Sequence, residues 1–400
     1  MPHERSRYLS QPLKKALKFS PIVGLLGQRQ TGKTTLLLSQ VGSSYVSMDD
    51  LAQLRIAQQS PATFVERPGL FGIDECQLAP ELFPALKLRV QKHKGPGQFI
   101  LTGSIRFTSR KLIRESLTGR IFNLQLLPLT LMESHDFPLG DLFESMKRPL
   151  EGMQKRLESF LKASPWSAQK VEAYLNSGGL PGICFHRERT IRIGKWNAHL
   201  ETILERDLRM VIETSLPYSS LRRILEMVAE RQGEPANISE WSRKSRVSTP
   251  TLKKILSAYE ALFLIRKVSS IGDRKRDIFF VEDQGMATYL SARNDSIQDK
   301  IRALFAELNA QALYRYPAEA AVSSYETRGG SWVPLVFSKG NHKIGLIPVI
   351  GDVPDLRALH SARSFLKRFP KAQILIVNDG KEIIPIDSRM FSVPYSFIYA

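Results

Sequence analysis

The sequence predicts an α/β fold, with a parallel sheet covered by helices on both faces, then a basic helix-turn-helix module, then a second α/β domain. Apolar, strand-like segments alternate with helical ones over the first 126 residues, which is typical of a parallel sheet. A helix-turn-helix pattern with two strand-like runs occupies residues 236–283, and strand-like runs flank one helical segment between residues 332 and 377. The predicted domains are a sheet-containing core (1–137), a helical linker or lid (138–235), a winged helix-turn-helix (236–283) and an α/β domain (284–400).

The elements of the first domain can be assigned in order along the chain. Strands are expected at residues 22–26, 44–48, 69–75, 98–104 and 120–126. Helices are expected near residues 1–20 and 35–40, from Leu51, and from Pro80 to about Lys92. Asp49 or Asp50 can cap the helix at Leu51, because a short acidic side chain accepts hydrogen bonds from the free N–H groups of a helix start. Ligands bind at the carboxyl ends of such strands, so we expect the functional site at that edge.

Composition favours a globular protein of the cytoplasm. The chain has 400 residues, 42% hydrophobic and 24% charged, which suggests two or three domains with ample buried cores. No apolar run approaches the roughly 20 residues of a membrane span, and the first residues lack the apolar core of a signal peptide. The two cysteines, Cys76 and Cys184, are far apart, which argues against a disulfide framework or a zinc site. We expect no membrane partner.

The stretch Gly27-Gln28-Arg29-Gln30-Thr31-Gly32-Lys33-Thr34 fits the pattern G-x-x-x-x-G-K-[ST] at every fixed position. A strand before it and a helix after it are the context of a phosphate-binding loop. Glycines let successive N–H groups point at phosphate oxygens, Lys33 would reach the β- and γ-phosphates, and the Thr34 hydroxyl would bind Mg²⁺. The sequence therefore predicts an ATP site with Mg²⁺. The expected nucleotide-binding residues are Gly27, Gln28, Arg29, Gln30, Thr31, Gly32, Lys33, Thr34 and Thr35.

Acidic and hydroxyl side chains follow two other strands at the same edge. Asp74 and Glu75 end an apolar segment; Asp74 would hold Mg²⁺ and Glu75 would orient the water that attacks the γ-phosphate. Thr102 or Ser104 would contact the γ-phosphate or that water. The alternatives are an acidic helix cap for the pair and ordinary turn chemistry for the hydroxyls.

An ordered set of motifs resembles one family. The stretches are Ile73-Asp74-Glu75-Cys76-Gln77, Leu101-Thr102-Gly103-Ser104, Leu117-Thr118-Gly119-Arg120, Pro128-Leu129-Thr130, Gly178-Gly179-Leu180-Pro181-Gly182 and Leu204-Glu205-Arg206-Asp207. They are similar to the prokaryotic AAA-type P-loop ATPases that carry a C-terminal DUF4143 domain. The resemblance implies an arginine near the γ-phosphate, for which Arg120 is the candidate, with Arg106 and Arg114 nearby. Such an arginine could act in its own chain or in a neighbouring copy, and a surface ion pair is the alternative. For Arg206 and Asp207, the resemblance favours a clamp or a contact to the ATPase core over catalysis.

A dense basic charge marks the helix-turn-helix module. The chain carries a net charge of +18, which attracts polyanions but can also reflect solubility. Between Ala236 and Arg276, ten Lys or Arg residues stand against three acids. In the usual docking of a winged helix, such side chains meet the major groove and flanking phosphates; a protein contact is the alternative. The candidates for contacts to duplex DNA are Arg243, Lys244, Arg246, Lys253, Lys254, Arg274, Lys275 and Arg276.

The order of elements in the last domain resembles a restriction-endonuclease-like fold, which many members of that family carry. The resemblance implies an Asp in the first strand and Glu-x-Lys in the second. Here Pro334 replaces the Asp, and Pro348 and Ile350 replace the Glu and Lys. Without carboxylates nothing holds a metal ion, so we predict an inactive nuclease-like domain; Asp352 and Asp355 are a weaker candidate for a displaced site. A proline inside a strand is expected at an edge or a bulge.

Three hypotheses follow. The first is a Mg²⁺-dependent ATPase in which Lys33, Glu75, Thr102, Ser104 and Arg120 act in catalysis, and Thr34 and Asp74 bind the metal. The second is an ATP-gated DNA-binding switch with negligible turnover. The third is a structural or scaffold role for the C-terminal fold, with the ATPase acting on a protein client. Separately from these hypotheses, the chain could form a homo-oligomer.

Overall fold

The N-terminal core is a five-stranded parallel sheet. The computed structural model describes residues 5–107, 116–291, 295–352 and 355–400. The strands follow the order β2-β3-β4-β1-β5, and every pair is parallel. Their bounds confirm the predicted segments: β1 Ile22–Leu26, β2 Tyr45–Ser47, β3 Phe71–Asp74, β4 Phe99–Gly103 and β5 Ile121–Gln125.

Helices cover both faces of this sheet, as predicted. The helices of the core are α1 Ser10–Ala16, α2 Lys33–Val41, α3 Leu51–Gln59, α4 Pro61–Phe64 and α5 Leu82–Lys92. Ile22 and Leu26 of β1 pack in one core with α5, whereas Val23 and Leu25 pack in another with α1 and α2. This alternation follows from the two-residue period of a strand. The predicted cap of α3 is confirmed, because the Asp50 carboxylate accepts hydrogen bonds from the N–H groups of Ala52 and Gln53.

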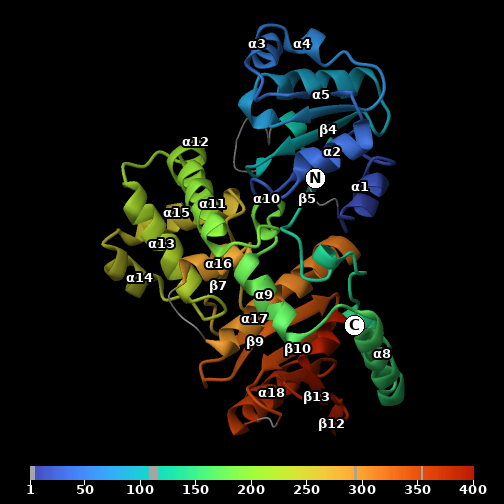
Figure 1. The fold of residues 1–400 in the computed structure, drawn as a ribbon, viewed down its shortest axis with the longest axis vertical. Helices are drawn as coiled ribbons and strands as arrows, with labels where there is room; N and C mark the ends of the chain where they lie inside the picture. The colour runs from blue at the N-terminus through green and yellow to red at the C-terminus, as the bar shows by residue number, and fades with distance from the viewer. Residues whose placement is uncertain (1–4, 108–115, 292–294, 353–354) are drawn as a thin grey trace.

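A helical region connects the core to the rest of the chain. Its helices are α7 Leu142–Met146, α8 Leu150–Ala163, α9 Ala168–Ser177, α10 Pro181–Cys184, α11 Arg189–Glu201, α12 Leu208–Val211 and α13 Tyr218–Glu230. The long helix expected from Arg189 to about Thr214 is present up to Val211, and a π-helical segment (Thr202–Asp207) interrupts it between α11 and α12. Figure 1 places α9 and α10 between the core and the C-terminal sheet.

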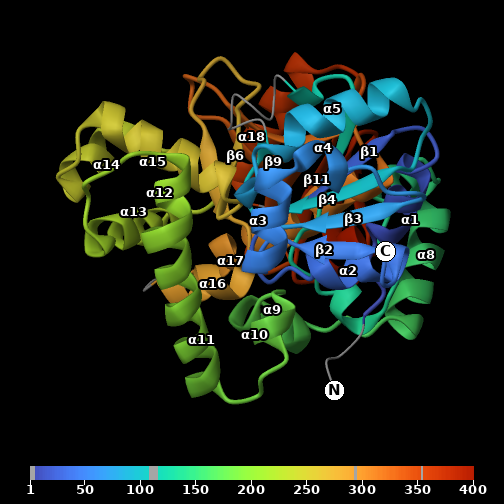
Figure 2. The same cartoon turned by 90° about the horizontal axis from the view of Figure 1, so that it is seen from above.

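The basic module contains the two helices and two strands that the sequence predicts. These are α14 Ile238–Ser245, α15 Thr249–Ala261, and the antiparallel pair β6 Ile265–Val268 and β7 Ile278–Val281, followed by α16 Gln284–Leu290. Ser248 caps α15 by accepting a hydrogen bond from the N–H of Thr251. Figure 2 shows α13, α14 and α15 projecting on the side of the molecule opposite α8. The winged helix assignment stays a prediction.

The C-terminal domain is a six-stranded mixed sheet. Its elements are α17 Ser296–Ala310, a π-helical segment Gln311–Arg315, β8 Ala320–Glu326, β9 Trp332–Lys339, β10 His342–Pro348, α18 Leu356–Arg368, β11 Gln373–Asn378, β12 Ile384–Asp387, β13 Met390–Pro394 and a final 3-10 segment Tyr395–Tyr399. The strand order is β12-β13-β11-β10-β9-β8. Pro334 lies where the register between β8 and β9 shifts, opposite Ser323–Tyr325, so the expected bulge is confirmed there. Pro348 instead ends the central strand β10 in regular register with Val377 of β11, so the expectation of an edge or a bulge is wrong for this proline. The nuclease-like assignment stays a prediction.

A buried carboxyl group in α17 makes the stability of the protein depend on pH. Burial raises the pKa of Glu307 from 4.5 to about 7, although the Gln311 amide donates a hydrogen bond to it. The folded protein therefore binds this proton more tightly than the unfolded chain, and stability falls as pH rises from about 4.5 to about 7. Over this pH range, we expect the free energy of unfolding to fall less in Glu307→Gln than in wild type. The difference between the two proteins should reach up to about 3 kcal/mol, because one pKa unit corresponds to about 1.4 kcal/mol.

Urea unfolding at several pH values measures this effect. The matched control is Glu382→Gln, which removes an exposed carboxylate. An identical pH profile for wild type and Glu307→Gln would show that Glu307 does not carry the effect.

No helix among the described residues is long and apolar enough to cross a membrane.

Candidate nucleotide site

The phosphate-loop stretch connects β1 to α2, as its sequence context predicts. Gly32 has φ 92° and precedes the first turn of α2, a backbone region that favours glycine. At Gly27, a Cβ atom would lie 2.4 Å from the Leu126 carbonyl oxygen. Both glycines are therefore required by the local backbone, one by conformation and the other by close approach.

Lys33 lies inside the curve of this loop. Its Nζ donates to the carbonyl oxygens of Gly27 and Gln28, at 3.0 and 2.9 Å. Burial lowers the pKa of Lys33, and the nearby carboxylates of Glu75 and Asp74 oppose that shift. The cation is thus held by the loop itself, at the position from which the pattern predicts contact with phosphates.

Asp74 joins three elements of the core at one edge. Thr34 Oγ1, at the start of α2, donates to Asp74 Oδ2 at 2.9 Å, and Thr102 Oγ1, on β4, donates to Asp74 Oδ1. Burial raises the pKa of Asp74, and these two hydrogen bonds work against the shift. A hydroxyl and a carboxylate side by side offer oxygen atoms as metal ligands. Mg²⁺ prefers such ligands, and substrate phosphates usually complete its coordination. The residues present fit a Mg²⁺ ion.

Glu75 follows directly and has a strained backbone. Its φ of 50° places a non-glycine residue in the left-handed region. Such a conformation costs of order 1–3 kcal/mol, and residues that adopt it cluster at functional sites. Its N–H donates to Thr102 Oγ1 at 3.0 Å, and Ser104 Oγ donates to its carboxylate at 3.2 Å. The structure therefore brings the predicted residues Asp74, Glu75, Thr102 and Ser104 together.

Gln77 belongs to this constellation, although the sequence reasoning did not select it. Its amide Nε2 donates to the Glu75 carboxylate and to Ser104 Oγ, the latter at 3.1 Å. The side chain is 3% exposed. A buried amide two residues after a Glu at a strand end is the signal that could have found it, because a buried polar group needs partners.

The structure does not bring Arg120 to the phosphate loop. Ile121 pairs with Ile22 at the amino ends of their strands, so Arg120 lies at the opposite edge of the sheet from Gly27. Its guanidinium donates to the Thr118 carbonyl at 3.3 Å. Of the two alternatives, a γ-phosphate contact within the same chain does not fit this position, because the strand that follows Arg120 begins where the phosphate-loop strand begins; a contact to a neighbouring copy stays a prediction.

Of the two nearby arginines, Arg106 faces the basic module and Arg114 lies outside the described residues. Arg106 Nε donates to the Glu260 carbonyl at 2.9 Å, its N–H donates to the Ala261 carbonyl at 2.8 Å, and its guanidinium lies 4.8 Å from the centre of the Phe263 ring. Burial lowers the pKa of Arg106. The loop after β4 is thereby attached to the end of α15.

The helical region closes over the phosphate loop from the other side. Arg29 forms an ion pair with Asp207 at 2.6 Å, and Asp207 is buried in the π-helical segment. The expected contact between Asp207 and the core is thus confirmed. Gln28 contacts the His199 ring at 3.3 Å, and burial, reinforced by Arg29 and Lys33, lowers the pKa of His199 to about 4. The histidine is therefore neutral near pH 7.

The N-terminal segment also contacts the phosphate loop, and the sequence did not indicate this contact. Arg7 donates to the carbonyl oxygens of Thr31 and Leu127, both at 2.6 Å, and pairs with the buried Glu133 at 2.9 Å. The phosphate loop is thus fixed by side chains that are distant in sequence, which no local motif indicates.

The structure divides the predicted DNA contacts into two groups. Arg243, Arg246, Lys253 and Lys254 are exposed, and Lys244 is exposed but pairs with Glu240 at 2.6 Å. By contrast, Arg274 and Arg276 form ion pairs with Glu326 on β8, and the loop between β6 and β7 pairs with that strand through the N–H of Ile271 and the Ser324 carbonyl.

Arg274 and Lys275 are nevertheless exposed, so the expected contact of Arg274-Lys275-Arg276 with DNA stays a prediction. The edge strand of the C-terminal sheet binds this loop, because its unpaired backbone groups find partners there. Lys275 itself donates to the Ser270 carbonyl at 3.4 Å.

Mainly apolar side chains lie at the end of the C-terminal sheet where the sequence predicts an inactive metal site. A cavity of about 440 Å³ lies at this end of the sheet, lined mainly by apolar residues that include Trp332, Pro348 and Ile350. Asp355, the displaced candidate, caps α18 by accepting from the Ala358 N–H at 2.6 Å. Among the described residues, no group of three or more His, Cys, Asp or Glu side chains could hold a metal. Inactivity stays a prediction.

Comparison with known proteins agrees with the geometry of the core. Residues 19–135 match the family model described as an AAA domain, which supports an AAA-type ATPase domain in this part of the chain. Residues 168–296 match a different model, a domain of unknown function named DUF8612; the DUF4143 designation stays a prediction. The chain is 24% identical over 397 residues to the uncharacterized proteins Mb2031c of Mycobacterium bovis and Rv2008c of Mycobacterium tuberculosis, covering 96% of this chain and 82% of each of them.

Two solved structures overlap with the chain to a limited degree. One is a signal-transduction ATPase (STAND) with a tetratricopeptide repeat sensor from Pyrococcus horikoshii, at 13% identity and a TM-score of 0.26, covering 79% of this chain and 48% of that one. This chain thus spans about half the length of that protein. The other is AMPPCP-bound DnaA from Aquifex aeolicus, at 15% identity and a TM-score of 0.27, covering 63% of this chain and 85% of that one. The assignment of the core rests on the family match and on the site.

Proposed function

We propose that this protein is a Mg²⁺-dependent ATPase of the AAA type, in which the nucleotide state controls the position of a basic DNA-binding module. The observation that supports it best is the convergence of Thr34, Asp74 and Thr102 through hydrogen bonds beside the buried Lys33. These residues come from three separate elements of one sheet edge. A structural role alone does not require an acid, two hydroxyls and a phosphate loop at one place.

The roles of the residues follow from their chemistry. Lys33 and the N–H groups of residues 27–35 would bind the phosphates, and Thr34 and Asp74 would hold Mg²⁺, which would supply positive charge to the phosphate oxygens. Glu75 orients the attacking water and accepts its proton, while Thr102 and Ser104 position the Glu75 backbone and carboxylate. Arg120 lies at the opposite edge, so its proposed target is the nucleotide of a neighbouring copy in a homo-oligomer.

The link to the basic module runs through the loop after β4. Thr102 and Ser104 belong to the site, while the next two residues contact the basic module. Ile105 is 2% exposed and packs in the core that also holds Leu252 and Leu256 of α15. Arg106 donates hydrogen bonds to the carbonyl oxygens at the end of α15. A rearrangement around Thr102 and Ser104 would therefore shift α15 directly.

The exposed face of α15 supports a nucleic-acid partner. Lys253 and Lys254 are exposed on it, next to Arg243 and Arg246 of the preceding helix and turn. Lysines so placed give salt-sensitive contacts to phosphates rather than readout of bases. A protein client is the alternative partner.

A second candidate, the ATP-gated switch with negligible turnover, is favoured by one observation. The carboxylate of Glu75 is engaged by Gln77 and Ser104, and a carboxylate held in this way is less free to orient water. The two candidates differ in whether ATP is hydrolysed when DNA is bound.

ATP turnover measured with and without duplex DNA tests the proposal. We expect DNA to raise the turnover of wild type, and we expect Lys253→Gln/Lys254→Gln to lose most of this stimulation, since each lost phosphate contact reduces affinity and the salt dependence of binding. The matched control is Lys367→Gln/Lys381→Gln, which removes two exposed lysines of the C-terminal domain. DNA binding that is unchanged between low and high salt would contradict phosphate contacts, and no turnover under any condition would favour the switch.

A further inference from the structure

A second cavity opens beside the hairpin that joins β9 and β10. Its volume is about 710 Å³, within the range of roughly 300–1,000 Å³ that is typical of small-molecule sites. Three of its lining residues, Phe143, Met146 and Ile344, are buried and apolar. Its cationic or titratable basic residues are Lys147, Lys339, His342, Lys343 and Lys371, and Glu319 is the one acid among the lining residues.

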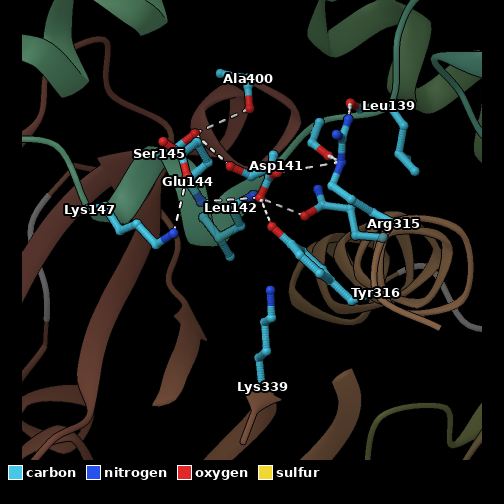
Figure 3. Close-up of polar contacts among 12 residues, drawn as sticks. Leu139, Asp141, Leu142, Glu144, Ser145, Lys147, Arg315, Tyr316, Lys339 and Ala400 are labelled. Carbon is cyan, nitrogen blue, oxygen red and sulfur yellow. Dashed lines mark hydrogen bonds and ion pairs between the residues drawn. The ribbon is translucent and has the colours of Figure 1, made fainter. Parts of the chain in front are cut away.

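The wall formed by α7 is held in place by hydrogen bonds to the C-terminal domain, as Figure 3 shows. Asp141 caps α7 and accepts from the Tyr316 hydroxyl at 2.7 Å, and Arg315 donates to the carbonyl oxygens of Leu139 and Gly140. The Ser145 hydroxyl donates to the Asp141 carbonyl at 2.8 Å. The cavity is therefore formed before any ligand arrives, which reduces the entropic cost of binding.

The cations of the cavity are only partly compensated. Lys339 pairs with Glu319 at 3.5 Å and its Nζ lies 3.8 Å from the centre of the Tyr316 ring, and Lys147 pairs with Glu144 at 3.2 Å. Within the part of the chain that the structure describes, Lys343 has a ring contact, with Phe369 at 5.6 Å, and neither it nor Lys371 has an acidic partner. Like charges gathered around one small volume repel, and an anion between them would remove that repulsion.

We propose that this cavity binds a nucleoside phosphate, either free or as the phosphorylated end of a nucleic-acid strand. The lysines supply point charges for phosphate oxygens, and the apolar side chains supply contact area for the base and sugar. The site is distinct from the phosphate loop, which lies in the other sheet. It is also distinct from the nuclease-like position, because Pro334 and Pro348 lie at the other ends of β9 and β10. The inference does not depend on the proposed ATPase activity.

Calorimetric titration of a Lys33→Ala background isolates this site, since the phosphate loop is then disabled. The probes are ATP, 5′-phosphorylated hexathymidylate and the same hexathymidylate without the phosphate. We expect saturable binding of a phosphorylated probe with one site per chain. Adding Lys343→Gln/Lys371→Gln should weaken that binding by about tenfold or more, because each lysine would supply a charge-assisted hydrogen bond to the phosphate oxygens. Adding Lys367→Gln/Lys381→Gln instead should leave it unchanged.

The probes separate the two sources of the phosphate. Binding of ATP supports a free nucleotide, and binding of the phosphorylated but not the unphosphorylated hexathymidylate supports a strand end. Three results would overturn the proposal. The first is equal binding of both hexathymidylates with no binding of ATP, and the second is no saturable binding of any probe. The third is a loss of binding in the Lys367→Gln/Lys381→Gln variant equal to that in Lys343→Gln/Lys371→Gln. Circular dichroism and thermal melting check that the Lys343→Gln/Lys371→Gln variant is folded.

Discussion

Glu75→Gln should lose about 10²- to 10⁴-fold in ATP turnover while its affinity for ATP stays close to that of wild type. A positioned general base contributes a factor of this size, and the amide cannot accept the proton of the attacking water. Gln has nearly the same shape, so the hydrogen bonds that fix the backbone, such as the one from the Glu75 N–H to Thr102, are retained. Lys33→Ala should instead lose both binding and turnover, because in the proposed site its cation would contact the phosphates directly.

Two measurements separate these effects. Single-turnover hydrolysis reports the chemical step, and equilibrium titration with ATP in the presence of Mg²⁺ reports binding. The matched control is Glu81→Gln, an exposed acid just before α5, which should behave as wild type. Equal turnover of wild type and Glu75→Gln would exclude Glu75 as the base.

Gly179→Ala should prevent the protein from folding to its native structure. A Cβ atom at this position would lie 2.0 Å from the Leu129 carbonyl oxygen and 2.6 Å from its nitrogen, and both are backbone atoms that cannot move aside independently. The same glycine donates its N–H to the buried Asp283 at 2.7 Å and accepts from the Leu129 N–H at 2.8 Å. We expect a loss of more than about 4 kcal/mol, which is exceptional for a point mutation and comparable to the whole stability of many domains.

The control for this prediction lies in a neighbouring helix. Gly194 is exposed in α11, and a Cβ there would meet no atom within 4 Å. Gly194→Ala should stabilise the protein by about 0.5–1 kcal/mol, since alanine loses less backbone entropy in a helix. Soluble yield, circular dichroism and the urea midpoint measure both variants. A Gly179→Ala variant that unfolds at the wild-type midpoint would show that the backbone there can move apart.

The N-terminal sheet and the nucleotide site could be predicted from the sequence because their signals are local. A strand followed by Gly27–Thr34, and acids at the end of Phe71–Asp74, report directly on a phosphate loop and a parallel sheet edge. These inferences need only residues that are close together in the chain.

The interactions that join the domains could not be predicted in this way. The hydrogen bond from Arg7 to the phosphate loop and the ion pairs of Arg274 and Arg276 with Glu326 depend on how separate parts of the chain pack. The position of Arg120 illustrates the same limit, because a motif match gives a residue type and not the edge of the sheet on which it lies.

The burial of Ile105 in the core of the basic module has a thermodynamic consequence. An interaction that ties the nucleotide site to the packing of α15 works equally in both directions, since coupling free energies are reciprocal. Suppose that a partner binds the module and shifts α15. That partner must then change the affinity of the phosphate loop for nucleotide by a certain factor, and nucleotide must change the affinity of the module for the partner by the same factor. Under the proposed function, the packing of Ile105 would therefore make the partner an effector of the nucleotide site as much as the nucleotide is an effector of the partner.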